Sequence, residues 1–163
     1  MIDIHINWEG PFTHSEALNL NSKCDYGLYT FYGDHLMYGK DVLLYLGKAE
    51  KQTFGIRIRQ HNWELWTSGI ISLYVGRIAS KTPLIKEDWH LQISLAEKII
   101  LQSHNPSFNS SNLNTIGYRG EDTRILNWGK RKLLLPEVSM SRWEGEYSIG
   151  NHLRDVFKVQ SIF

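Results

Sequence analysis

Short apolar and aromatic segments alternate with two longer segments of helical character, and this order limits what the chain can fold into. Residues 27–32 and 42–46 are rich in aromatic and aliphatic side chains and are separated by turn-forming residues, so they predict a β-hairpin. Residues 69–75 predict a buried strand. Residues 53–66 and 87–104 predict helices. The expected fold class is therefore α+β, with a small central, mostly antiparallel sheet of about three strands flanked by helices.

The C-terminal part of the chain predicts a second, smaller hairpin. Residues 107–122 are polar and typical of a loop. Residues 123–128 and 137–143 have the character of two strands joined by a polar connection. Residues 147–158 are expected to form a short terminal helix. We therefore expect a β-hairpin extension attached to the central sheet.

Composition is typical of a packed domain. Eighteen Lys and Arg residues face seventeen Asp and Glu residues, and the net charge of +1 creates no overall field that favours a polyanion or a membrane. No apolar run approaches the roughly 18 residues of a membrane span, and the first residues lack signal-peptide character. The lone Cys24 excludes an internal disulfide and a zinc site built from cysteines. We expect a soluble, cytoplasmic protein without membrane contact.

One position of the second predicted helix departs from its surroundings. An apolar stripe along this helix is formed by Trp89, Ile93, Ala96 and Ile100. Glu97 projects into the same apolar sector. Burial of an unpaired carboxylate costs several kcal/mol, so Glu97 needs a cation, a metal ion or a raised pKa. The alternative is a residue at the edge of the stripe whose carboxylate reaches water.

The first predicted helix and the first two strands carry further candidates. Arg57 and His61 are four residues apart and are expected on one helix face, where they can bind a phosphate oxygen. The alternative is a solvated helix surface. Tyr29 and Tyr45 lie mid-strand, where the alternative is an ordinary core position. The histidines show no spacing typical of a metal site.

Five sequence motifs occur in a defined order within residues 25–110. They are Gly27-Leu28-Tyr29, Tyr45-Leu46-Gly47 followed by Lys48-Ala49, Phe54-x-x-Arg57-Ile58-x-x-His61, Ala96-Glu97 followed by Ile99-Ile100, and Pro106-Ser107-Phe108-Asn109. Together they resemble the motifs of the GIY-YIG nuclease family. The resemblance implies a nuclease core at 25–110, with 1–24 as an N-terminal extension packed on it and 111–163 as a C-terminal extension of the same globular unit. The connection from Tyr32 to Asp41 is longer than in most family members and resembles an insertion.

The resemblance implies a hydrolase that cuts DNA phosphodiester bonds with water and one Mg²⁺ or Mn²⁺ ion. Either phenol is then the base, and nearby cations are needed to lower its pKa from about 10. The implied catalytic residues are Tyr29, Tyr45, Lys48, Arg57, His61, Glu97 and Asn109. Among them, Lys48, His61 or Arg57 supplies the cations near the phenols, and Arg57 also clamps the phosphate. Glu97 is the single protein ligand of the metal, and Asn109 orients the backbone and the neighbouring groups behind Glu97.

A basic turn is the candidate contact for duplex or branched DNA. Lys130, Arg131 and Lys132 lie at the tip of the second predicted hairpin and can contact phosphates. The alternative is an ordinary solvated turn. For the whole chain, the alternative to an endonuclease is a non-catalytic nucleic-acid-binding or regulatory domain on the same scaffold. A third possibility is an interaction module without a role in nucleic-acid binding.

Overall fold

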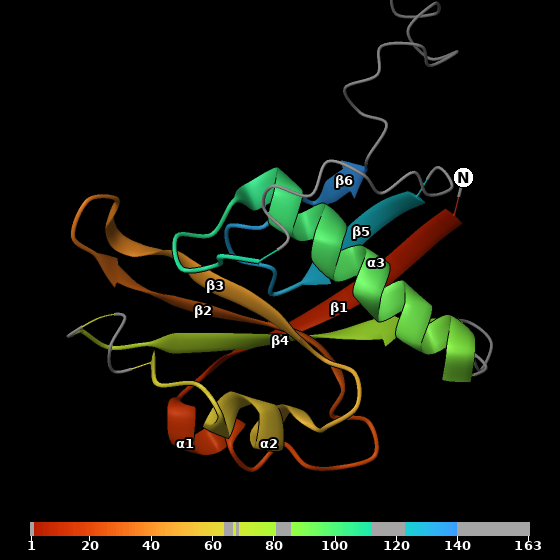
Figure 1. Ribbon diagram of the computed structural model, residues 1–163, viewed down its shortest axis with the longest axis horizontal. Coiled ribbons are helices and arrows are strands. Elements are labelled where there is room, and N and C mark those ends of the chain that lie inside the picture. Colours follow the sequence, from red (N-terminus) through yellow and green to blue (C-terminus); the bar gives the residue numbers. More distant parts are fainter. Residues whose placement is uncertain (1, 64–66, 68, 81–85, 112–122, 140–163) are drawn as a thin grey trace, which may run out of the picture.

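The computed structural model describes residues 2–63, 67, 69–80, 86–111 and 123–139. In this part of the chain, six strands form one sheet in the order β3-β2-β4-β1-β5-β6 (Figure 1). The strands are β1 (Ile2–Phe12), β2 (Gly27–His35), β3 (Gly39–Ala49), β4 (Ser72–Ala79), β5 (Thr123–Gly129) and β6 (Glu137–Ser139). The helices are α1 (His14–Ala17), α2 (Phe54–Arg59) and α3 (Lys86–His104).

The α+β class is confirmed, but the expected sheet of about three mostly antiparallel strands is wrong. β1 lies inside the sheet, antiparallel to β4 and parallel to β5, which makes the sheet mixed. The physical reason is the strict alternation of β1, which directs Ile4, Ile6 and Trp8 into the core and leaves Asp3 and Asn7 exposed. The segment that was expected to be an extension therefore supplies an interior strand.

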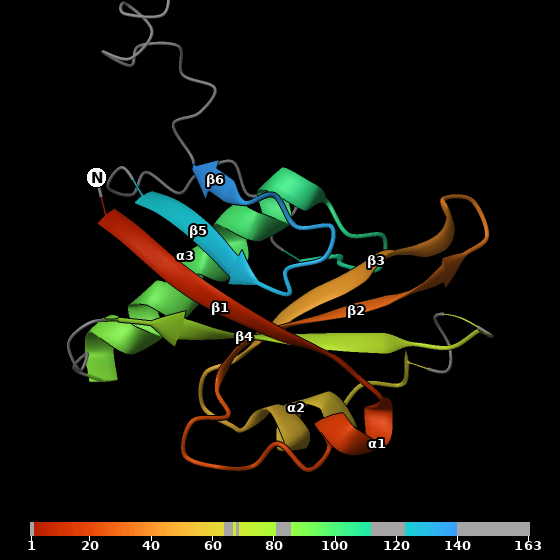
Figure 2. The same cartoon turned by 180° about the vertical axis from the view of Figure 1, so that it is seen from behind.

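Two layers of helices cover opposite faces of the sheet. α3 packs on one face, while α1 and α2 lie together on the other side of the molecule (Figures 1 and 2). Successive residues of β2 point into different layers, because Leu28 packs in the cluster that contains Ile93 and Tyr29 packs in the cluster that contains Phe54. β2 therefore contributes side chains to both cores.

The helices differ in how well they match expectation. α3 ends at His104 as predicted. The helix predicted at 53–66 ends much earlier, at Arg59, and Gln60 is its C-cap. His and Asn residues follow at 61 and 62, and both side chains have a low helix propensity, which favours an early end. None of the helices in the described residues is long and apolar enough to cross a membrane.

The second hairpin is present in the structure. β5 pairs with β6 in antiparallel register, with Ile125 opposite Val138. Both side chains are buried against the layer of α3. The predicted strand residues 140–143 and the predicted helix 147–158 lie outside the described residues.

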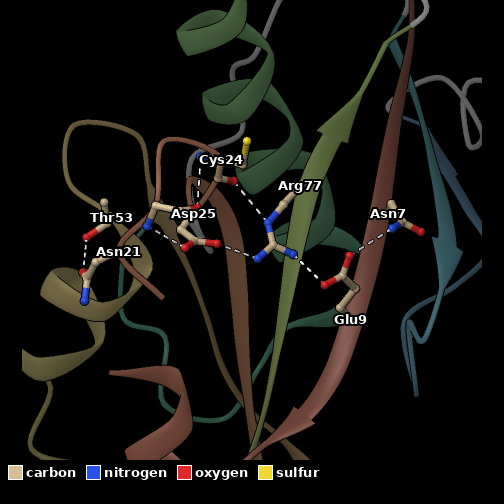
Figure 3. A network of polar contacts seen from close by, with 8 residues as sticks. Asn7, Glu9, Asn21, Cys24, Asp25, Thr53 and Arg77 are labelled. Carbon is tan, nitrogen blue, oxygen red and sulfur yellow. Dashed lines mark hydrogen bonds and ion pairs between the residues drawn. The ribbon is translucent and has the colours of Figure 1, made fainter. Parts of the chain in front are cut away.

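A polar network fixes the start of α2 to the sheet. Arg77 on β4 donates hydrogen bonds to Glu9, to Asp25 and to the carbonyl oxygen of Cys24 (Figure 3). The carbonyl oxygen of Asp25 in turn accepts the first amide of α2, from Phe54, at 2.8 Å. The position of α2 therefore depends on an ion pair beneath it.

Candidate active site

Five of the predicted site residues meet at one edge of the sheet. β3 is the outermost strand, and α2 and α3 approach its end from the two faces. The residues come from separate elements: Tyr29 from β2, Tyr45 and Lys48 from β3, Arg57 from α2 and Glu97 from α3. Their charges act on one another, because Arg57 lowers and Glu97 raises the pKa of both phenols. The structure thus brings together residues that are up to 68 positions apart in the chain (29 to 97).

An aromatic cluster forms the inner wall of the candidate site. The Oη atom of Tyr29 lies 2.6 Å from Nε2 of His61, and the ring of Tyr45 lies 4.8 Å from the imidazole. His61 was expected on the same helix face as Arg57, but α2 ends at Arg59, so His61 lies in the segment that follows the helix. A Cβ atom at Gly47 would lie 2.6 Å from the Tyr29 hydroxyl. Any side chain at position 47 would therefore displace this phenol.

Burial dominates the acid–base chemistry of this cluster. Burial raises the pKa of Tyr29 well above its ordinary value, the neighbouring Tyr45 raises it further, and Arg57 acts in the opposite direction. Burial likewise raises the pKa of Tyr45. Burial and Arg57 together lower the pKa of His61 to about 4. Both partners of the Tyr29–His61 hydrogen bond are therefore neutral at pH 7, so His61 does not serve as one of the expected cations.

Glu97 is enclosed by the protein. Its side chain is 12% exposed, and its carboxylate lies 3.6 Å from Nζ of Lys48. Burial raises its pKa, Lys48 lowers it, and the nearby Glu50 raises it. The carboxylate thus faces the cluster and does not extend into water, which was the alternative for a residue at the edge of the stripe.

Two residues that the sequence analysis missed complete the surroundings of Lys48. Nζ of Lys48 donates to the hydroxyl of Ser94 at 2.8 Å, and this hydroxyl donates to the carboxylate of Glu50 at 2.8 Å. Spacing alone could have suggested both residues. Glu50 is two positions after Lys48 at the end of a strand, and Ser94 is three positions before Glu97 on a helix.

A basic hollow lies beside this network. Its volume is about 240 Å³, and it is lined by Lys48, Ala49, Glu50, Lys51, Gln52 and Arg57. Arg57 is half-buried, donates a hydrogen bond to Gln60 and also interacts with the hydroxyl of Tyr29, which lowers the pKa of that phenol. Three cationic side chains around one hollow are suited to the oxygens of a phosphate group.

Asn109 acts on the edge strand. Its side-chain amide accepts from the backbone N–H of Leu46 at 2.9 Å and donates to the carbonyl oxygen of Leu46 at 2.8 Å. The amide of Phe108 donates to Leu44 at 2.9 Å. Asn109 therefore fixes the backbone of β3 between Tyr45 and Gly47, next to both the phenol of Tyr45 and Lys48.

Two of the three basic residues of the turn 130–132 form contacts within the protein. The ammonium group of Lys132 pairs with Asp41 and lies 4.4 Å from the centre of the Tyr32 ring. Arg131 donates to the carbonyl oxygen of Leu134. Lys130 is exposed. Of the three residues predicted to contact DNA, the structure thus leaves Lys130 turned toward solvent.

The carboxylates of the site suit a hard divalent cation. Within the described residues, no three His, Cys, Asp or Glu side chains are grouped so that they could hold a metal ion. Mg²⁺ typically uses one or two carboxylates, several waters and substrate phosphates. The enclosed carboxylate of Glu97 fits the role of a single protein ligand. It forms an ion pair with Lys48 and interacts electrostatically with Arg57, so positive charge already stabilises it at this position.

Comparisons of the chain with protein-family models, with curated proteins and with solved structures gave no match. The geometry of the site and the ordered motifs are therefore the grounds for a functional proposal.

Proposed function

We propose that the protein is a divalent-metal-dependent endonuclease that hydrolyses phosphodiester bonds in DNA. The observation that carries the proposal is the enclosed carboxylate of Glu97, which is coupled electrostatically to Arg57 and to both phenols. A buried carboxylate costs free energy, so its presence opposite a guanidinium group and two phenols is better explained by function than by packing.

In this proposal, the hydrogen-bonded pair of Tyr29 and His61 accepts the proton that the attacking water releases. The phenol stays protonated at pH 7 because burial raises its pKa, so it is not a base alone. The neutral imidazole, 2.6 Å away, can take the phenolic proton on Nε2 while the Tyr29 oxygen accepts a proton from water. Because the pKa of His61 is lowered to about 4, the imidazole is a weak base and holds this proton only while the water attacks.

The charged residues act on the phosphate group. Arg57 presents a planar guanidinium to the non-bridging oxygens, where negative charge increases in the transition state. Lys48, held by Ser94, adds a second positive charge on the same side. Glu97, as the carboxylate ligand, would hold a Mg²⁺ or Mn²⁺ ion, which supplies Lewis-acid stabilisation of the phosphate and of the leaving oxygen.

Nicking of a supercoiled plasmid tests the proposal. We expect nicking in Mg²⁺ or Mn²⁺ that is abolished by EDTA. Glu97→Gln and Arg57→Ala are expected to reduce the rate by about 100-fold or more, since each removes charge stabilisation at the reacting group. Arg59→Ala is the matched control, because Arg59 is an exposed arginine on the same helix and lies outside the site.

Equal nicking by Arg57→Ala and Arg59→Ala would refute the assigned clamp. Plasmid nicking that persists in EDTA would refute the metal dependence. Circular dichroism of each variant separates loss of chemistry from loss of fold.

A non-catalytic nucleic-acid-binding domain on the same scaffold is the second candidate. It is favoured by one observation: Lys48 pairs with both Glu97 and Glu50, at 3.6 and 3.4 Å, so the carboxylates have a cation of their own. This candidate predicts salt-dependent binding of DNA without nicking in any divalent metal. The plasmid assay therefore separates the two functions.

A further inference from the structure

The turn between β2 and β3 holds apolar side chains out in solvent. Leu36, Met37 and Tyr38 have exposed fractions of 105%, 85% and 68%. They are consecutive, and they lie at the tip of the hairpin, at the opposite end of the molecule from the N-terminus (Figures 1 and 2). Adjoining apolar side chains of this exposure are characteristic of an interaction site.

The turn is rigid, because its own polar groups fix its conformation. Nδ1 of His35 accepts hydrogen bonds from the amides of Met37 and Tyr38, each at 3.2 Å. The imidazole stacks on the Tyr38 ring, with a centroid distance of 4.6 Å and an angle of 21°. Its other neighbour is Phe108, at 5.3 Å. These contacts fix the backbone of the tip, so the backbone entropy lost on binding is small, while the exposed side chains of Leu36 and Met37 still lose rotamer freedom.

The tip and the candidate active site are carried by the same two strands. Tyr45 is six positions after Gly39, the first residue of β3, so the strand spans roughly 20 Å between them at about 3.3 Å per residue. This length corresponds to about six base pairs of duplex at 3.4 Å each. A duplex bound at the site and aligned with β3 therefore reaches the tip.

The size of the patch favours an auxiliary contact over an independent interface. Three side chains of this kind offer on the order of 500 Å² of surface, whereas a stable protein interface takes about 800 Å² from each partner. Leu and Met are side chains that proteins insert between base steps, and a tyrosine ring can stack on a base. Of the two acidic residues beside the turn, Asp41 is paired with Lys132, which reduces repulsion of phosphates, and the exposed Asp34 accepts the backbone amide of Asp41.

We infer that the Leu36-Met37-Tyr38 turn is a wedge that enters a base step of the duplex bound at the candidate active site. This inference rests on the proposed function, because it places the wedge on the same DNA. Leu36 and Met37 unstack the base pairs, and the cost of unstacking is offset by the burial of both side chains. The wedge acts at a step about six base pairs from the phosphate that is cut.

Duplexes with a single 2-aminopurine test the wedge, since this base becomes more fluorescent when it is unstacked. Ca²⁺ replaces Mg²⁺ to permit binding without cleavage, and the position of 2-aminopurine is moved along the duplex. We expect increased fluorescence at one step or at adjacent steps. The double variant Leu36→Ser, Met37→Ser should lose this signal and bind about 10-fold more weakly. Ile2→Ser is the control, because Ile2 is also exposed and lies at the far end of the sheet.

Each outcome assigns success or failure separately to the wedge and to the hydrolysis. Nicking by the wild-type protein with no 2-aminopurine signal would overturn the wedge and leave the nuclease intact. A 2-aminopurine signal without nicking would support the wedge and refute the hydrolysis. An effect of the double variant on vesicle binding or self-association, with unchanged DNA binding, would overturn the wedge in favour of another partner. Absence of duplex binding would overturn both.

Discussion

At the scale of single residues, the candidate site combines neutral proton carriers with charged neighbours. His61 and Tyr29 are kept neutral by burial, whereas Arg57 remains a cation beside them. A neutral imidazole can accept a proton, and an arginine cannot lose one in ordinary conditions. The proposed mechanism therefore assigns the handling of protons and the stabilisation of negative charge to different side chains.

The lowered pKa of His61 predicts a pH dependence of stability. The pKa is about 4 in the folded chain and near 6.5 when unfolded, so between these values the unfolded state binds more protons. The free energy of unfolding should therefore fall as the pH drops from about 6.5 to about 4. Because water partly screens this half-buried ring, we expect about 1 kcal/mol from His61.

Urea unfolding at several pH values measures this effect. His61→Gln should flatten the decline in stability between pH 6.5 and 4. His104, whose pKa is also lowered by burial, contributes to the slope that remains, and the carboxylates with lowered pKa values, Glu16 and Glu50, add to it near pH 4.5. An unchanged slope in His61→Gln would show that the imidazole titrates normally in the folded protein.

At the scale of elements, the segment that follows α3 protects the edge of the sheet. An outer strand presents unpaired backbone groups and is open to pairing with another chain. Asn109 engages both backbone groups of Leu46, and Phe108 bonds to Leu44. The strand that carries Tyr45 and Lys48 therefore keeps a fixed position, although the described part of the chain places no further strand beside it on that side.

Asn109→Ala should loosen this edge. It removes two hydrogen bonds to partly buried backbone groups, and we expect a loss of about 1–3 kcal/mol in the free energy of unfolding. Hydrogen exchange should accelerate at the amide of Leu46. Ser110→Ala, a change at the adjoining exposed residue, is the control and should alter neither quantity. Equal exchange in the two variants would contradict the role of Asn109.

The hydrogen bonds and ion pairs of Arg77 connect α2 to the sheet. Asp25 is 6% exposed, and although burial raises its pKa, the hydrogen bonds from Arg77 and Ser22 outweigh that effect and lower it. Arg77→Met leaves the carboxylate without its cation, and removal of one partner of a largely buried pair typically costs about 3 kcal/mol. Because Asp25 also accepts the first amide of α2, the variant should displace Arg57 as well.

Thermal unfolding and plasmid nicking together check this prediction. Arg77→Met is expected to lower both the melting temperature and the nicking rate. Arg124→Met is the matched control: its ion pair with Asp3 is exposed, so its loss should change little. Similar destabilisation by both variants would indicate that the network beneath α2 has no special role.

At the scale of the whole molecule, one strand joins the two halves of the sheet. β1 lies between β4 and β5, and the indole of Trp8 donates to Asn127, 119 positions away, at 2.8 Å. Residues 25–110 alone, which match the ordered motifs, should therefore not fold, because they lack β1 and its buried side chains. Far-UV circular dichroism should show an unfolded fragment, and a cooperative melt would contradict this.

Point variants on β1 refine the same prediction. Ile6 is fully buried, and Ile6→Ala should cost about 2–5 kcal/mol. Asn7→Ala changes the next, exposed position and should be nearly neutral. Urea unfolding of both variants measures the contrast that the strand's alternation predicts.

Local signals in the sequence predicted some of these elements and not their long-range pairing. The aromatic runs of β2 and β3 and the apolar stripe of α3 are local patterns, and all three elements form. The alternation from Ile2 to Glu9 is also a local pattern and could have identified β1. Its parallel pairing with β5 could not be read locally, because nothing near Ile2 specifies a partner beyond residue 120. Spacing could have suggested Ser94 and Glu50 as neighbours of the site, but their shared contact with Lys48 depends on the packing of α3 on β3, which no local pattern specifies.

The interior place of β1 has a consequence during protein synthesis. β1 leaves the ribosome before both strands that flank it, and about 60 residues separate its end from β4. At about 5–20 residues per second, this strand waits for roughly 3–12 s with Ile4, Ile6 and Trp8 uncovered. β5 is translated later still. The nascent chain therefore passes through a period in which an apolar strand is available to chaperones or to neighbouring nascent chains before its own sheet can receive it.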